Sequence, residues 1–121
     1  MNQPRLKDKI FEYIKKHDGT TFVEIERIFD EYSFDYKGEG AYTSGSNEKV
    51  IFWIGWNQAA FNLIADLKQD ALIKMSVCSP LIYMIDGKSL KLPIAKSKNI
   101  KTDHWLPVTF SINKEDIKNE R

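Results

Sequence analysis

The sequence lacks features that are typical of several large classes of protein: several cysteines, a strong net charge and long apolar runs. Cys78 is the only cysteine, so no disulfide can form within the chain, and we expect a reducing, cytoplasmic environment. The 18 Lys and Arg residues nearly balance the 17 Asp and Glu residues, and the net charge of +1 argues against a protein that attracts polyanions with its whole surface. The longest apolar run, residues 50–56, is far shorter than the ~20 residues that span a bilayer, and residues 1–8 do not resemble a signal peptide. We therefore predict no membrane association.

Signatures of metal binding and of catalysis are also missing. His17, Cys78 and His104 lie far apart and lack the spacing of zinc ligands, so we predict no metal site and no cofactor. Asp103, His104 and Ser111 are the residue types of a catalytic triad, but the chain has no G-x-S-x-G turn to hold a nucleophile. We therefore predict that the protein is not an enzyme.

The overall composition is that of an ordinary globular domain. Of the 121 residues, 42% are apolar and 29% are charged, which fits one domain that buries a core without disulfides or metal. We place this domain at residues 1–112. Residues 113–121 are mostly charged, and we predict that they form a flexible tail.

Apolar residues recur with helical spacing in three segments, residues 4–17, 21–32 and 58–69. Thr21, with Glu24 three residues later, matches a capping box at the start of the second helix, and Asn57 is suited to cap the third. The second helix is predicted to carry an acidic face opposite its apolar stripe, formed by Glu24, Glu26, Asp30 and Glu31.

Turn residues and short apolar runs occupy the rest of the chain. Residues 33–49 are rich in glycine and serine and predict a long mobile surface loop, followed by a buried strand at residues 50–54 that Gly55 breaks. Residues 72–77 and 81–85 predict two strands joined by a turn at residues 79–80, and residues 86–87 (Asp-Gly) predict a hairpin turn. Further strands are predicted at residues 89–92 and 106–112.

The order of these elements resembles a winged helix-turn-helix domain. The resemblance is closest over residues 57–87, which look like a recognition helix, a strand, a wing turn and a returning strand. Residues 20–25 (T-T-F-V-E-I) are similar to the opening of the second helix in such domains, and Leu67, Asp70 and Leu72 match the junction between the third helix and the first wing strand. The predicted fold is therefore α+β and winged-helix-like, with three helices, a small antiparallel hairpin or sheet and an extra C-terminal strand.

Two features depart from that pattern. Residues 33–56 separate the second and third helices, where such domains have a short turn, and either an insertion or another small α+β arrangement accounts for them. The predicted wing turn at residues 78–80 carries no Lys or Arg.

The resemblance implies binding to double-stranded DNA, with the third helix in the major groove. Asn and Gln side chains can pair with adenine edges, and clustered lysines can contact phosphates. The candidate DNA-binding residues are Gln58, Asn62 and Gln69 on the third helix and Lys88, Lys91, Lys96, Lys98 and Lys101 in a segment without acidic residues. Both groups are explained equally well as ordinary solvent-exposed side chains that contact no DNA. We predict a small DNA-binding protein of a regulatory system or a mobile element.

The alternative function is a docking module for another protein. The acidic face of the second helix suits that role, and four aromatic residues follow it closely in the sequence: Tyr32, Phe34, Tyr36 and Tyr42.

Overall fold

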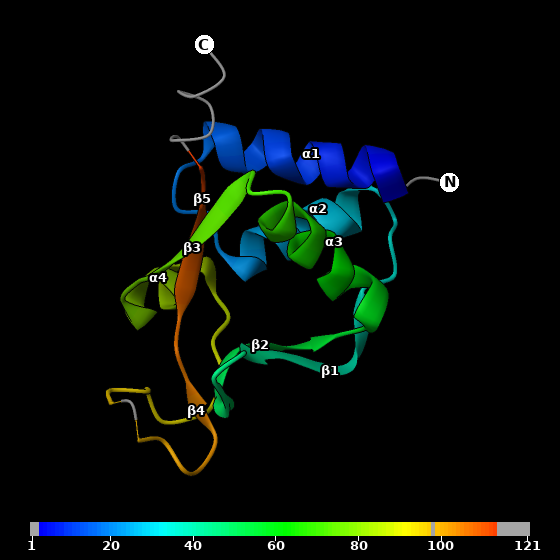
Figure 1. Cartoon of the computed structure of the whole chain (residues 1–121). Helices are drawn as coiled ribbons and strands as arrows, with labels where there is room; N and C mark the ends of the chain where they lie inside the picture. Colours follow the sequence, from blue (N-terminus) through cyan, green and yellow to red (C-terminus); the bar gives the residue numbers. More distant parts are fainter. Residues whose placement is uncertain (1–2, 98, 114–121) are drawn as a thin grey trace.

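The computed structural model describes residues 3–97 and 99–113 and shows an α+β fold (Figure 1). This part of the chain contains four helices and two sheets. In chain order the elements are α1 (Gln3–Lys16), α2 (Phe22–Glu31), β1 (Lys37–Ser44), β2 (Asn47–Trp56), α3 (Gln58–Gln69), β3 (Ile73–Val77), α4 (Pro80–Asp86), β4 (His104–Trp105) and β5 (Val108–Ile112). In Figure 1, α1 lies above α2 and α3, the β1–β2 hairpin lies below them, and β3 and β5 run down one side.

The three predicted helices are confirmed, and the capping residues predicted for α2 and α3 act as the sequence indicates. Thr21 Oγ1 accepts a hydrogen bond from the Glu24 amide at 3.1 Å, and Glu24 Oε1 accepts one from the Thr21 amide at 3.0 Å. These are the reciprocal bonds of a capping box. Asn57 Oδ1 accepts from the Ala60 amide at 2.9 Å and caps α3. Each helix then buries its apolar stripe, which on α1 consists of Leu6, Ile10 and Ile14.

A small antiparallel sheet joins distant parts of the chain. β3 pairs with β5, and Met75 lies opposite Phe110. On the other side of β5, the Thr20 amide donates to the Phe110 carbonyl at 3.0 Å, and the Phe110 amide donates back to the Thr20 carbonyl at 2.8 Å. β5 therefore lies between β3 and the residue that precedes the α2 cap. The strand predicted at residues 106–112 is confirmed, and its partner is β3.

The predicted return strand at residues 81–85 is wrong, because this segment forms the helix α4. Ser79 Oγ accepts from the Leu81 amide at 3.1 Å and caps the helix, and Pro80 occupies its first turn, where no amide is needed. Gly87 ends the helix in the left-handed conformation, with φ of 91°, so it is not part of a hairpin turn. Residues 89–92 form no strand either. These capping signals override the strand-like composition of the segment.

The predicted mobile loop at residues 33–49 is wrong over most of its length, because β1 pairs with β2. A Cβ at Gly38 would lie 2.8 Å from the Asn57 backbone, and a Cβ at Gly40 would lie 2.7 Å from the Trp56 carbonyl oxygen. The glycines therefore allow close approach of backbones rather than mobility. Gly55 does not end β2; its φ of +97° accompanies an irregular register in which Trp56 faces two residues of β1.

Two long segments extend from the helices and the β3–β5 sheet: the β1–β2 hairpin and the segment that contains α4 and β4. The two ends of each segment lie close together. At the base of the hairpin, the Asn57 amide donates to the Tyr36 carbonyl at 2.7 Å. At the base of the segment that contains α4 and β4, the Cys78 amide donates to the Pro107 carbonyl at 3.0 Å. β4 pairs in parallel with β2, so the β1–β2–β4 sheet connects the two segments.

Aromatic side chains from both segments form the centre of the core. Trp53, Trp56 and Trp105 are buried. The ring of Phe22 on α2 stacks on Trp53 with ring centres 5.6 Å apart and meets Trp56 and Phe110 edge-on. The core therefore depends on contacts between α2, the hairpin and β5.

Candidate functional site

The exposed face of α3 carries three of the residues predicted to contact DNA. Gln58, Asn62 and Gln69 are all exposed, opposite the buried stripe of the helix. Gln58 Nε2 donates to Asn62 Oδ1 at 2.8 Å, so the structure brings these two together. Asp66 is exposed on the same helix between Asn62 and Gln69. Its negative charge opposes the approach of a phosphate backbone to this face.

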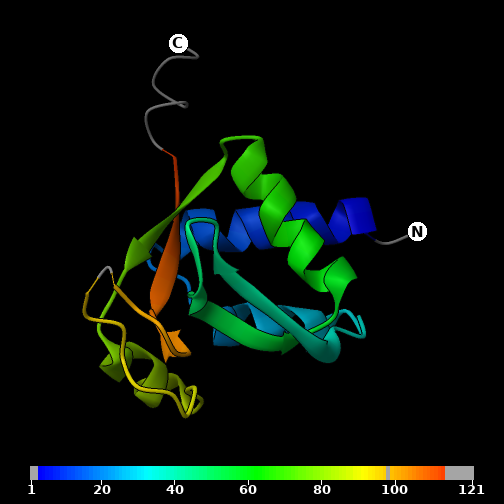
Figure 2. The same cartoon turned by 60° about the horizontal axis from the view of Figure 1, so that its bottom comes forward.

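The predicted lysine contacts lie elsewhere on the molecule. Lys91, Lys96 and Lys101 are exposed, whereas Lys98 lies outside the described residues. Figures 1 and 2 both place residues 88–97 and 99–103, coloured yellow to orange, well away from α3. Lys96 lines an open groove of about 740 Å³ between this segment and the turn of the β1–β2 hairpin. The structure thus does not bring the lysine segment and the α3 face onto one surface.

Lys88 takes part in a buried network that the sequence analysis missed. Its ammonium group lies 2.7 Å from Glu26 Oε1. Glu26 is only 6% exposed, and its Oε2 accepts from the indole N–H of Trp53 at 3.0 Å and of Trp56 at 2.8 Å. A buried carboxylate is tolerated when charge and hydrogen bonds compensate it in this way. Glu26 shares helical spacing with the buried Phe22 and is the signal that could have revealed the network.

The acidic face predicted for α2 is smaller in the structure than in the sequence. Glu26 points into the core, and Glu24 Oε2 accepts a hydrogen bond from the Tyr13 hydroxyl at 2.6 Å. Only Asp30 and Glu31 of the four predicted acids are exposed. The docking surface predicted there therefore loses half of its charge to internal contacts.

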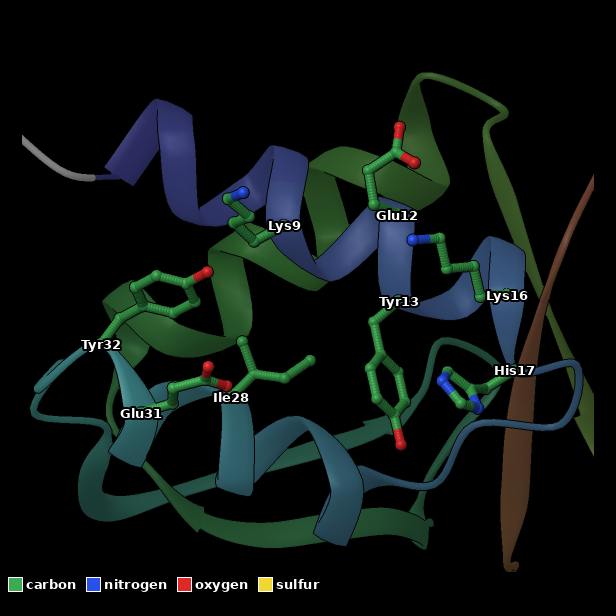
Figure 3. A pocket seen from close by; sticks show the side chains of 8 residues that line it. All are labelled: Lys9, Glu12, Tyr13, Lys16, His17, Ile28, Glu31 and Tyr32. Atoms are coloured by element: carbon green, nitrogen blue, oxygen red, sulfur yellow. The ribbon is translucent and has the colours of Figure 1, made fainter.

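A shallow groove of about 310 Å³ lies between α1 and α2 (Figure 3). The Tyr13 and His17 rings stack beneath α1 with centres 4.1 Å apart. Burial and the hydrogen bond to Glu24 raise the pKa of Tyr13 to about 12, so the hydroxyl keeps its proton at neutral pH and acts as a donor. The remaining ionisable residues carry both signs of charge: Lys9, Glu12, Lys16 and Glu31. The groove thus has no single electrostatic character that selects a charged ligand.

α4 is fixed firmly in place by its inward-facing side. The buried Tyr83 hydroxyl donates to the Val108 carbonyl at 2.6 Å and accepts from the Phe22 amide at 3.2 Å. Asp86 at the end of the helix accepts from the Thr21 hydroxyl at 2.6 Å. The helix is therefore joined to β5 and to the start of α2.

The outward-facing side of α4 is apolar and exposed. Ile85 is 84% exposed, Leu81 and Met84 are each 62% exposed, and Ile82 is 41% exposed. Val77, at the end of β3, is 67% exposed. Figures 1 and 2 show α4 at the periphery of the molecule. We call these five residues the α4 patch.

Capping residues could have identified this helix from the sequence. Ser79 and Pro80 form a typical helix start, and Gly87 forms a typical helix end. With a helix in place, Leu81 and Ile85 fall on the side opposite Tyr83, and Ile82 and Met84 fall on the two flanks.

Comparison of the chain with models of known protein families, with curated proteins and with solved structures gave no match. Within the described part of the chain, no three His, Cys, Asp or Glu side chains converge in a way that could hold a metal ion. None of the helices in residues 3–97 and 99–113 is both long enough and apolar enough to cross a membrane. The functional argument therefore rests on the surfaces described above.

Proposed function

We propose that the protein is a protein-interaction module whose docking surface is the α4 patch. The observation that carries this proposal is the exposure of large apolar side chains on a helix that buried contacts hold rigid. Single exposed apolar residues are common in proteins and need no explanation. A contiguous group of them is different, because a partner that covers it removes apolar surface from water, which is favourable.

The size of the patch supports this function. Five side chains with this exposure leave apolar surface on the order of 500 Å², which is the size of the largest patch on a typical monomer, and such a patch is often functional. Patches of this kind mark sites that bind proteins or membranes. The rigid attachment of α4 favours binding as well, because little conformational entropy is lost when a partner covers it.

We propose that the framework around the patch is a variant of the winged-helix arrangement. The support for this is the order of α1, α2 and α3 before the small antiparallel β3–β5 sheet, with Thr20 bonded to the far side of β5. α4 begins directly after β3, where the resemblance predicts a wing. Domains of this type also serve as docking modules, which agrees with the proposal.

DNA binding is the second candidate function. The exposed Gln58–Asn62 pair on α3 favours it, because amide side chains can recognise adenine edges. The charges give it less support. Asp66 lies on the same face, Lys88 is engaged by Glu26, and the remaining lysines of the segment lie away from α3.

Photocrosslinking tests the proposed function. A photoreactive amino acid at position 85 should capture a protein in cells that produce the chain, whereas the same group at the exposed Gln69 should not. Equal labelling at both positions, or none at position 85, would contradict the proposal. A mobility-shift assay with random duplex at low salt tests the second candidate, and we expect no shift from the folded protein.

A further inference from the structure

We infer that the α4 patch is covered by the same patch of a second copy of this chain, in a twofold-symmetric dimer. The inference rests on the proposed function, because it names the partner of the same surface. Its grounds are the absence of charge in the patch, the arrangement of its side chains and its area.

The segment that carries the patch has no charged residue between Lys74 and Asp86. Residues 75–85 contain no Asp, Glu, Lys, Arg or His. Interfaces with independent partners are about as polar as the rest of a protein surface, whereas homodimer interfaces are more apolar. Charges also provide the steering and selectivity that an unrelated partner needs. A second copy needs neither, and an uncharged patch meets its own image without repulsion.

The side chains on α4 suit a symmetric contact. Leu81 and Ile85 lie one helical turn apart on the outward side of the helix. In a twofold contact the residue pairs are reciprocal, so an antiparallel crossing of two α4 helices places Leu81 of each copy beside Ile85 of the other. Met84 has a flexible side chain that fills gaps in such a contact. Two copies of α4 can therefore meet through the same residues.

The area fits a weak, reversible dimer. Two patches that face each other remove apolar surface on the order of 1,000 Å² from water, before any polar rim is counted. A stable interface buries about 1,200–2,000 Å² in total. The apolar centre therefore accounts for most of what a dimer of the smaller class requires.

Sedimentation velocity of the purified 121-residue chain, from about 1 to about 100 μM, tests the inference. We expect a reversible monomer–dimer equilibrium in this range. Ile85→Glu should raise the dissociation constant by at least roughly 100-fold, because the interface contains the substitution twice and each copy buries a charge. Gln69→Glu adds the same charge at an exposed position on α3 and should leave the equilibrium unchanged.

Two further measurements keep the outcomes distinct. Ile85 is 84% exposed in the monomer, so circular dichroism and thermal melting of Ile85→Glu should match the folded wild type at a concentration at which the wild type is monomeric; if they do not, Met84→Lys takes its place. A wild-type monomer at all concentrations, or a dimer that both substitutions leave intact, would overturn the inference. If that monomer still captures a different protein through position 85, the interaction module stands and only the second copy is refuted. If position 85 captures nothing and the protein instead floats with anionic phospholipid vesicles, both proposals fail.

Discussion

Removal of the Glu26 carboxylate should cause one of the largest losses of stability available from a single polar residue in this fold. Glu26 is buried on α2 and accepts three hydrogen bonds, two from indole groups on β2 and one from Lys88. Glu26→Ala removes the acceptor for all three. The indole N–H groups of Trp53 and Trp56 belong to fully buried side chains, so they lose their acceptor inside the core.

The expected cost follows from these contacts. Each buried N–H without an acceptor costs about 1–3 kcal/mol, and breaking a buried charged network by removing one partner costs about 3–5 kcal/mol. We therefore expect Glu26→Ala to lower the free energy of unfolding by about 3–5 kcal/mol, a large share of the ~5–15 kcal/mol typical of a domain. Glu26→Gln keeps one oxygen where Oε2 accepts both indoles and loses only the ion pair. Because the Lys88 side chain is 53% exposed, that loss should be about 1 kcal/mol.

Urea unfolding followed by tryptophan fluorescence provides the assay, because Trp53 and Trp56 are buried beside the substitution. Lys88→Met is the matched control for the ion pair, and its combination with Glu26→Gln completes a double-mutant cycle. A Glu26→Ala variant within about 1 kcal/mol of wild type would refute the reasoning. If Glu26→Gln were as damaging as Glu26→Ala, the ion pair rather than the indole bonds would dominate.

Three further predictions concern the hairpin, the α2 cap and pH. Gly40→Ala should destabilise the protein by urea unfolding, because the new Cβ would lie 2.7 Å from the Trp56 carbonyl oxygen, whereas Gly45→Ala, with open space around it, is the control that should be nearly neutral. Thr21→Ala should cost about 1–2 kcal/mol, because the hydroxyl both caps α2 and donates to α4, and Thr21→Ser should retain most of that free energy; a loss near zero would contradict both roles. The pKa of Tyr13 is raised from 10.0 to about 12, so the unfolded chain ionises first and the free energy of unfolding should fall as pH rises between these values. Tyr13→Phe should reduce that fall, and an unchanged pH dependence would exclude Tyr13 as its source.

The parts of the fold that depend on neighbouring residues were predictable. α2 and α3 begin after Thr21 and Asn57 because the cap and the bonded amide lie within three residues of each other. The stripe of α1 follows from the helical repeat alone. These signals can be recognised in a single sequence because the interacting residues lie close to one another in the chain.

The predictions were wrong where the role of a residue depends on a partner far away in the sequence. Gly38 and Gly40 resemble loop residues, yet their role is to let β1 approach Asn57 and Trp56. Glu26 resembles a surface acid, yet its carboxylate accepts hydrogen bonds from Trp53 and Trp56, which lie about thirty positions later in the chain. The α4 error is different, because its capping residues were readable and only the strand-like composition of the helix was weighted more heavily.

The candidate site shows the same limit. The candidate amides on α3 and the described candidate lysines after α4 are exposed, and their role in binding stays a prediction. Whether two such groups share a surface depends on how the chain folds back between them, and here it carries them apart. A shared periodicity can place residues on one helix face, but it holds no information on the direction of a loop.

The location of the three tryptophans has a consequence for how the chain folds. Trp53 and Trp56 lie on the hairpin and Trp105 lies on the segment that contains α4, so α1, α2, α3 and the β3–β5 sheet hold none of them. The helices alone cannot enclose a core, because their buried faces pack against aromatic side chains that lie far away in the sequence. The Tyr83 hydroxyl, for example, meets the Phe22 amide across 61 residues. Contacts of such long range slow folding, so we expect docking of the two segments, rather than helix formation, to set the folding rate.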